Sequence, residues 1–480
     1  MAHADSAGKE YFNSFKDGVS QLFSPKQTNS ADKIDISELS KFPLDTSKVS
    51  ELPVVGRASS APLASYGNTM PKQLGIVEAV HIAVQRRPEI TQSISSVAEQ
   101  ASNIDLAKSK YYPQLSGGIG TGDLTSGERG RQVVSLDATQ MLYDFGKVKS
   151  GVNIAEARML QQQAEVLVSL DSVSYDVASA IVNVKRYQEI TKIAHQQIKG
   201  IGRIAEIANL RAKAGISSQA DPIQAQSNLE AAQSNLVVQE TQLRQFEQRL
   251  RTLLGFDVSH VNWSIPDALV TKAELYAEPD YSKIPNMMMA LSGVEVAKFQ
   301  KKQAKLSAYP TINVRGSLSQ AINGRNPNNN EDDGFYNSIM LEASSNFYQG
   351  GAIAAQTRAA SYAEEAARAQ VNTSYLDVLD QVRMIREQVE NKKRQMSILV
   401  QRRETTVRTK ELYQEQYKLG TRTVVDLLNA EQAIHSAAQE IVSNQYDIYS
   451  AITQYIQVTG RSRDTYELNN ITIQGFEVQP

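Results

Sequence analysis

Residues 142–146 read LYDFG, and residues 347–351 read FYQGG. The two stretches share a tyrosine and a final glycine: Tyr143 and Gly146 in the first, Tyr348 and Gly351 in the second. A glycine close behind an aromatic anchor is typical of a corner at which a strand passes into a helix. Asp-Phe-Gly also holds magnesium in protein kinases, but this sequence lacks the lysine-bearing strand and the His-Arg-Asp loop of a kinase. We therefore interpret both stretches as structural joints.

The chain repeats itself on either side of these joints. Matching pairs recur in order: Ala107-Lys108 and Ala304-Lys305, Tyr112-Pro113 and Tyr309-Pro310, Ala214-Gly215 and Leu419-Gly420, Leu254-Gly255 and Thr459-Gly460. The nearly constant offset indicates an internal duplication of about 180 residues. Two long proline-free spans rich in Ala, Gln, Glu, Leu and Arg predict long helices, the first over about residues 147–213.

The duplication divides the chain into five segments. They are a polar extension, a first repeat, a linker, a second repeat and a tail, over 1–72, 73–255, 256–290, 291–460 and 461–480. We expect the first repeat to open with one helix over about residues 71–109. The start lacks the basic and apolar parts of a leader, and Ala2-His3-Ala4 resembles the end of a cleaved one, so a mature form is expected.

Each repeat also contains two segments of alternating polarity, which predict strands. They lie at about residues 110–121, 132–143, 309–319 and 336–348. Each is long enough to cross a bilayer, which takes about 9–11 tilted residues. Open sheet edges are not tolerated in lipid, so either the strands lie outside a membrane or several chains pool them. Two chains would give a filled eight-stranded barrel, and three would give twelve strands and a lumen.

Four tyrosines mark the ends of these strands. They are Tyr112, Tyr143, Tyr309 and Tyr348. Tyrosines at this position are expected in an aromatic girdle at the membrane interface. The alternative is that they are ordinary core aromatics.

Composition excludes several classes of function. The formal net charge is −2, so no overall field attracts nucleic acid, and the absence of cysteine excludes thiolate metal sites and cysteine catalysis. The histidines lack the spacing of metal ligands, and Glu331, Asp332 and Asp333 lack the alternate spacing of a calcium loop. We expect no enzyme, no cofactor and no metal. The sequence has no run of 18 or more apolar residues, so it does not predict a transmembrane helix.

The duplicated pattern of helix, two strands and long helices resembles the TolC family over roughly residues 73–460. Its most specific stretch is YKLGTRTVVDLLNAEQA, residues 417–433. The resemblance implies an α+β membrane protein, a homotrimer in the bacterial outer membrane. Its twelve-stranded β-barrel takes four strands from each chain and meets the lipid, and its long α-helical barrel forms a tunnel across the periplasm. The linker and tail are expected to form a belt around the tunnel, and the extension a partly ordered strap.

The resemblance also implies a gate where the helices break, at residues 214–221 and 419–426. The residues that match the family's tip clamp are Tyr417, Arg422 and Asp221, whose hydroxyl, guanidinium and carboxylate would converge. Gly215, Gly420 and Thr421 match the tip turns, where an adaptor makes contact. The family's threonine before the aspartate is Ala220 here, which removes one contact.

Asp426 matches the first of two aspartate rings that narrow the entrance in some family members. Asn429 stands where the second ring would lie, so weaker block by multivalent cations is expected. The alternative role for Asp221 and Asp426 is helix N-capping.

Three functions remain. The tip stretch and the long polar extension favour a passive exit duct for type I secretion of a protein substrate, of the kind that exports large adhesins. The partners implied are a periplasmic adaptor (a membrane fusion protein) and an inner-membrane ABC-type transporter, without nucleic acid. The first alternative is the outer-membrane channel of a multidrug efflux pump. The second is a soluble coiled-coil scaffold, which would not need strand pairs at matching places in both repeats.

Overall fold

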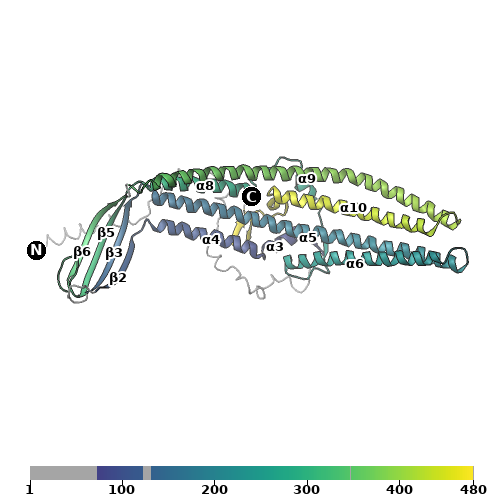
Figure 1. Ribbon diagram of the computed structural model, residues 1–480, viewed down its shortest axis with the longest axis horizontal. Helices are drawn as coiled ribbons and strands as arrows, with labels where there is room; N and C mark the ends of the chain where they lie inside the picture. Colours follow the sequence, from purple (N-terminus) through teal and green to yellow (C-terminus); the bar gives the residue numbers. More distant parts are fainter. Residues whose placement is uncertain (1–72, 123–130, 267, 346–347, 479–480) are drawn as a thin grey trace. The chain divides into compact units, whose positions relative to one another are not determined.

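The computed structural model describes residues 73–122, 131–266, 268–345 and 348–478 (Figure 1). The N-terminal extension over 1–72 lies outside the described residues. The chain divides into two compact units, which are described separately. The first unit contains residues 95–164 and 288–372, and the second contains residues 73–94, 165–287 and 373–478.

The main helices occur in three pairs of equal length. They are α4 (Pro88–Ser109) and α8 (Pro285–Leu306) with 22 residues each, α5 (Lys147–Lys213) and α9 (Ala352–Lys418) with 67, and α6 (Ala220–Leu254) and α10 (Val424–Val458) with 35. Equal lengths in both repeats agree with a duplicated chain. At about 1.5 Å per residue, α5 and α9 are each roughly 100 Å long.

The first unit contains an antiparallel sheet of four strands in the order β2-β3-β5-β6 (Figure 1). The strands are β2 (Gln114–Gly122), β3 (Arg131–Tyr143), β5 (Thr311–Asn323) and β6 (Phe335–Ser344). The two repeats meet in the middle of the sheet, where Leu136 lies opposite Leu318. Strands β2 and β6 are left as the two edges.

The register gives this sheet one apolar and one polar face. The apolar face carries Leu115, Ile119, Val134, Leu136, Val314, Leu318, Ile339 and Leu341. The polar face carries Ser135, Asp137, Thr139, Arg315, Ser317 and Glu342. All of these apolar side chains except the half-buried Val314 are exposed, Ile339 to 84% and Ile119 to 80%. A soluble chain rarely leaves such a contiguous apolar surface uncovered, so this face needs a non-aqueous neighbour.

Two of the four strands of this sheet begin directly after a proline. β2 follows Pro113 and β5 follows Pro310, because proline has no N–H for the ladder. The fourth strand was expected to reach residue 348 but ends at Ser344, which pairs with Thr311, the first residue after Pro310. Residues 346 and 347 lie outside the described residues.

The single helix expected over 71–109 is wrong. Residues Gln73–Gly75 form β1, which pairs in parallel with β4 (Asn262–Ser264), and α3 (Ile76–Val84) ends before α4 begins at Pro88. Proline cannot continue the backbone hydrogen bonds of a helix and disfavours a helical residue before it, so the chain starts a new helix there.

The linker and the tail pack together in the second unit. They contribute α7 (Ala268–Lys272), α11 (Ser462–Thr465) and a hairpin of β7 (Ile471–Ile473) and β8 (Phe476–Val478). Trp263, Tyr466 and Phe476 are fully buried. The Gln474 amide donates to the Val84 and Arg87 carbonyls, so the tail is fastened to the end of α3 and to the turn before α4.

A carboxyl group is buried beneath this tail. Asp171 of α5 lies against α11, where burial raises its pKa to about 7 although the Ser462 hydroxyl and the charge of Arg463 oppose the rise. The same burial raises the pKa of Tyr466, and the charge of Asp171 adds to that rise. Folding therefore holds Asp171 partly protonated at neutral pH.

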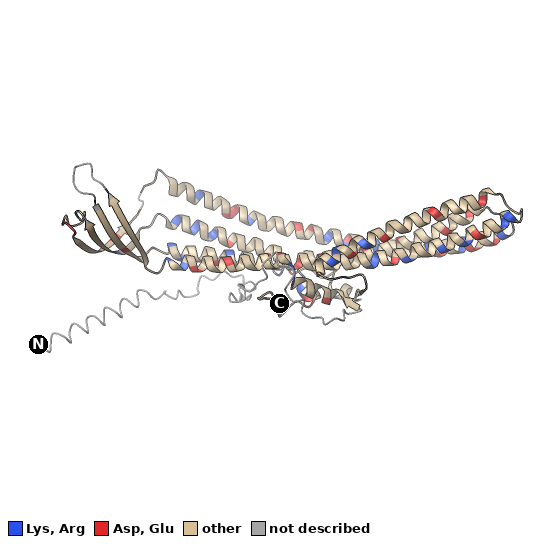
Figure 2. Ribbon diagram, turned by 90° about the horizontal axis from the view of Figure 1, so that it is seen from below, with Lys and Arg blue, Asp and Glu red and all other residues tan. Residues whose placement is uncertain are grey.

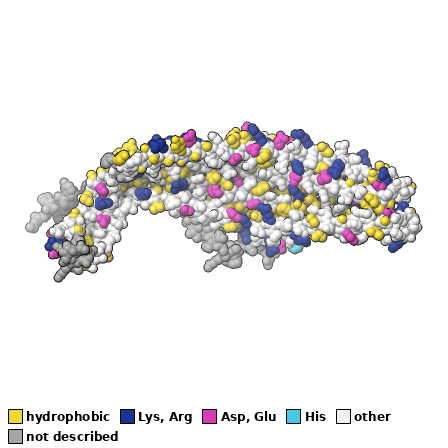
Figure 3. Space-filling model, viewed as in Figure 1, with side chains coloured by type: hydrophobic (Ala, Val, Ile, Leu, Met, Phe, Trp, Pro, Cys, Tyr) yellow, Lys and Arg dark blue, Asp and Glu magenta, His cyan; other side chains and the backbone are white. Residues whose placement is uncertain are grey.

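Acidic and basic residues are interspersed along the long helices (Figure 2), and their hydrophobic side chains appear in small groups between polar ones on the face shown in Figure 3. Among the described residues, no helix combines the length and the apolar character needed to cross a membrane.

Candidate functional site at the helix turns

The two corners quoted above have the same backbone conformation. Phe145 and Gly146 have φ angles of 58° and 92°, and Gly350 and Gly351 have 58° and 81°. The Asp144 carboxylate accepts hydrogen bonds from the backbone N–H groups of Gly146 and Val148, which caps the start of α5. The Asp-Phe-Gly triplet is therefore a structural joint.

The four strand-end tyrosines are exposed. The exposed fractions are 40% for Tyr112, 56% for Tyr143, 48% for Tyr309 and 87% for Tyr348. Phe145 packs between two of them, 4.8 Å from the ring centre of Tyr143 and 5.2 Å from that of Tyr309. The four tyrosines are therefore not core residues of this chain. Their role in an aromatic girdle at the membrane interface remains a prediction.

The turns that join α5 to α6 and α9 to α10 are also equivalent. Ile216 N–H donates to the Arg211 carbonyl, and Thr421 N–H donates to the Gln416 carbonyl. Each turn has a glycine in the left-handed conformation, Gly215 at φ 70° and Gly420 at φ 78°. These are Schellman turns, which satisfy the last carbonyls of a helix and favour glycine for its positive φ.

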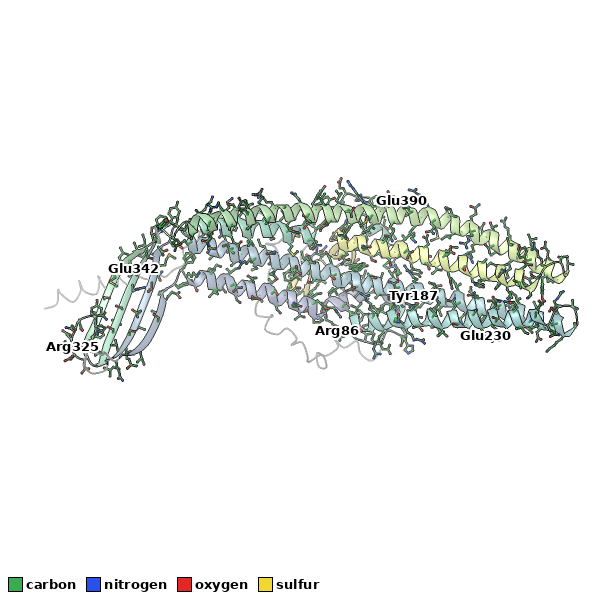
Figure 4. All side chains as sticks on the ribbon, viewed as in Figure 1. Arg86, Tyr187, Glu230, Arg325, Glu342 and Glu390 are labelled. Carbon is green, nitrogen blue, oxygen red and sulfur yellow. The ribbon has the colours of Figure 1, made fainter. Side chains whose placement is uncertain are left out.

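A shared hydrophobic cluster holds the four helices together next to the turns. Its buried members are Ile201, Ile204, Ala208, Ala225, Ala232, Tyr417, Val424, Leu427 and Leu428. The coiled-coil spacing of α6 continues this packing along the helix, where Phe246 stacks on Tyr187 (labelled in Figure 4) at 5.5 Å. The turns therefore lie at one end of a packed four-helix assembly.

Tyr417 is the buried side chain of the predicted clamp. Its ring lies under Arg211, with 4.8 Å from the guanidinium carbon to the ring centre, and its hydroxyl has no hydrogen-bond partner in the described chain. Burial raises the pKa of Tyr417; Arg211 opposes the rise and the charge of Asp221 adds to it. No hydrogen bond joins Asp221 to the Tyr417 hydroxyl within the described residues.

Arg422 has other neighbours in this chain. Its Nε donates to Gln416 Oε1 at 3.1 Å, its guanidinium lies 4.5 Å from the ring centre of Tyr413, and its Nη1 lies 3.8 Å from Asp426 Oδ1. The structure therefore pairs Arg422 with Asp426, not with Asp221. All these contacts are at the surface, where each is worth about 1 kcal/mol or less.

Asp426 also caps its helix. Its backbone N–H donates to the hydroxyl of the N-cap residue Thr423, and its carboxylate accepts from the Thr423 hydroxyl and backbone N–H. The same bonds hold the pKa of Asp426 below its usual value. Thr423, not Asp426, is therefore the N-cap residue of α10, and Asp426 takes part in capping as the third residue of the box. Asp221 stands in the first turn of α6, whose N-cap, Gln219, makes no side-chain capping bond.

Sequence reasoning missed one charged residue in this region. Glu431 lies within the quoted stretch 417–433, yet its carboxylate is buried and forms an ion pair with Lys410 of α9. Its Oε1 also lies 3.0 Å from His435 Nε2, one helical turn later. Burial alone would raise the pKa of Glu431, but His435 and Lys410 together lower it. In the sequence, the sign of this pair is the histidine four residues after the glutamate.

The acidic residues Glu331, Asp332 and Asp333 lie in the loop between β5 and β6. In the described part of the chain, no group of three or more His, Asp or Glu side chains is placed to hold a metal ion. Asp332 instead lies 3.3 Å from Arg325, which is labelled in Figure 4 in the loop between β5 and β6.

Long paired helices, matched turns and a sheet with one apolar face define the subunit of an outer-membrane channel. The chain belongs to the outer membrane efflux protein family, whose model matches residues 79–256 and 282–461. Members of this family are transport proteins, not enzymes, so the chain is an outer-membrane channel of efflux or secretion with its helices in the periplasm.

Curated relatives cover most of the chain at low identity. The efflux protein BepC of Brucella suis biovar 1 is 23% identical over 398 residues, 79% of this chain and 84% of BepC. TolC of Salmonella enteritidis is 22% identical over 428 residues, 84% of this chain and 86% of TolC. The alkaline protease secretion protein AprF of Pseudomonas aeruginosa is 22% identical over 411 residues, 79% of this chain and 82% of AprF.

Among solved structures, the outer membrane protein VceC of Vibrio cholerae has the same fold. Its TM-score is 0.69 at 16% identity, and the match covers 80% of this chain and 96% of VceC.

Proposed function

We propose that three copies of this chain form a duct through the outer membrane, each contributing four strands to a closed barrel. The edges of the sheet, β2 and β6, have no partner strand among the described residues. Lipid does not tolerate unpaired edges, and unlike edges can pair head to tail until a ring closes. The exposed apolar face would meet lipid, and the polar face would line the lumen. This two-faced sheet is the observation that carries the proposal.

The helix turns form the gate of the duct in this proposal. The buried Tyr417 hydroxyl has no hydrogen-bond partner among the described residues, and the charge of Asp221 acts on it, so Asp221 would be its partner in the closed gate. Arg422 is held only by exposed contacts, which it can exchange for Asp221 at little cost. Asp426 and Asn429 lie one turn apart and would form the constriction.

The substrate proposed is a protein exported by type I secretion, with an ABC-type transporter and a periplasmic adaptor as partners. The likeness to AprF, named for the secretion of alkaline protease, supports this choice. The exposed turns around Gly215, Gly420 and Thr421 would meet the adaptor.

Multidrug efflux is the second candidate. The likeness to BepC, which is named an efflux protein, favours it.

Deleting the gene separates the two candidates. The secretion duct predicts that surface and secreted proteins are lost while drug sensitivity changes little. Unchanged secretion with increased drug sensitivity would reject secretion in favour of efflux. Purified protein that stays soluble without detergent and never inserts into a planar bilayer would reject both.

A further inference from the structure

The carboxylate of Glu431 lies where three helices meet. Glu431 is 2% exposed and belongs to α10. Its carboxylate pairs with Lys410 of α9 and packs against Gly200 of α5. Helices α9 and α10 form one hairpin, whereas α5 belongs to the other. The side chain therefore makes a contact between the two hairpins, beside the cluster that contains Ile201 and Leu428.

While the Glu431 carboxylate keeps its place, only glycine fits at position 200. A Cβ built on Gly200 would overlap the Glu431 carboxylate, whereas a Cβ built on Gly202 would have no heavy atom within 4 Å. Glycine inside a helix is about 0.5–1 kcal/mol less favourable than alanine. No neighbouring atom explains the glycine at position 202, whereas the glycine at position 200 gives α10 room to approach α5.

The first repeat has no equivalent of this contact. Glu431 and His435 correspond by the duplication to Gln226 and Glu230, and those two side chains bond to each other on the exposed surface of α6 at 2.9 Å. Figure 4 labels Glu230 in the middle part of that helix. The buried carboxylate therefore does not follow from the duplicated architecture and belongs to the second repeat alone.

We propose that Glu431 is a positioning residue of the gate, a latch that holds α10 against α5 at Gly200 while the turns are closed. The latch rests on the proposed gated duct and adds to it a contact that is separate from Tyr417, Arg422 and Asp221. Lys410 and His435 move with Glu431 on their own hairpin, so the carboxylate stays paired when that hairpin moves away. What opening breaks is the packing of Glu431 on Gly200. The latch can therefore release without leaving a buried charge unpaired.

Two neighbouring glycines provide a matched test. Gly200→Ala should force α10 away from α5 and raise the time spent in the open conductance by about fivefold or more, as overpacking by one methyl group would produce. Gly202→Ala removes a glycine from the same helix without a clash, and should leave conductance at the wild-type level. Adding Glu431→Ala to Gly200→Ala should open the gate no further than either single change does, because both changes break the same contact.

Thermal unfolding of the detergent-solubilised trimer supplies a readout that does not depend on conduction. Gly200→Ala should lower Tm, Gly202→Ala should not, and the double variant should have a Tm no lower than that of Gly200→Ala. Equal behaviour of the two glycine variants, or additive effects of Gly200→Ala and Glu431→Ala in the double variant, would overturn the latch while wild-type channels leave the proposed duct intact. If Gly200→Ala does not assemble, Glu431→Ala alone decides: channels as closed as wild type would reject the latch. Wild-type protein that forms no channel would reject the duct, and the latch with it.

Discussion

The guanidinium of Arg211 covers the ring of Tyr417, and the hydroxyl at the far end of that ring is buried without a hydrogen-bond partner among the described residues. An unpaired buried hydroxyl destabilises a fold compared with a plain phenyl ring. In the proposed gate, Asp221, whose charge acts on this hydroxyl, would become its partner.

Tyr417→Phe should leave the thermal stability of the protein unchanged or slightly raised, because the fold loses no hydrogen bond. Combined with Arg422→Ser, it should raise single-channel conductance, because both groups that can reach Asp221 are gone. Tyr413→Phe, one turn earlier, is the matched control and should conduct like wild type. If the double variant also conducts like wild type, Tyr417 and Arg422 serve packing only.

Asn429→Asp should strengthen block by a trivalent cation. It adds a second carboxylate ring one helical turn from Asp426, and such rings bind cations in proportion to their charge. The block of planar-bilayer currents would be titrated in wild type, Asn429→Asp and Asp426→Asn. The expected order of affinity is Asn429→Asp, then wild type, then Asp426→Asn. Identical block in wild type and Asn429→Asp would place residue 429 away from the duct.

Ile339→Lys should prevent assembly in the outer membrane, whereas Met340→Lys should be tolerated. Ile339 lies on the apolar face, and a lysine facing lipid costs about 2–4 kcal/mol near the bilayer midplane. Met340 is opposite Arg315 on the polar face, so a lysine there would stay in water. The measurement is the amount of heat-resistant trimer in outer-membrane fractions. Equal yields of the two variants would contradict the assignment of the faces.

Asp171 should make the stability of the protein fall as pH rises. Its pKa is about 7 in the fold and 3.8 in the reference state, so between about pH 4 and pH 7 the folded chain keeps a proton that the unfolded chain releases. The free energy of unfolding therefore decreases through this window and levels off above it.

Asp171→Asn should remove that contribution and raise Tm at pH 8 more than at pH 5. Thermal unfolding in detergent at several pH values measures this. Asp176→Asn on the same helix is the control, since Asp176 is partly exposed and paired with Arg249 at 2.8 Å. Parallel Tm profiles for wild type and Asp171→Asn would mean that Asp171 is not buried in the assembled protein.

Local patterns in the sequence predicted the strands, the joints and the long helices. The expected strand over 132–143 is Arg131–Tyr143, and the helix expected over 147–213 has those bounds. Alternation and proline are local signals, and they act through the backbone of neighbouring residues. The break before Pro88 was missed although the same rule predicts it.

Contacts between distant helices were beyond such patterns. The sequence marks Glu431 only by a histidine four residues later, and its burial depends on the approach of α10 to Gly200, 231 positions earlier. Asp171 likewise becomes buried only when the tail at Ser462 and Arg463 folds over it. For the clamp, the resemblance supplied Asp221, but the chain itself pairs Arg422 with Asp426.

The central pairing of β3 with β5 has a genetic consequence. It leaves β2 from one repeat and β6 from the other as the free edges, so each copy in the proposed trimer must supply two different edges to two different neighbours. A copy with one defective edge strand could still join the trimer through its other edge and prevent the barrel from closing. In a cell that makes both alleles equally, only about one assembly in eight would be free of the defective chain. Mutations at either edge strand should therefore be dominant.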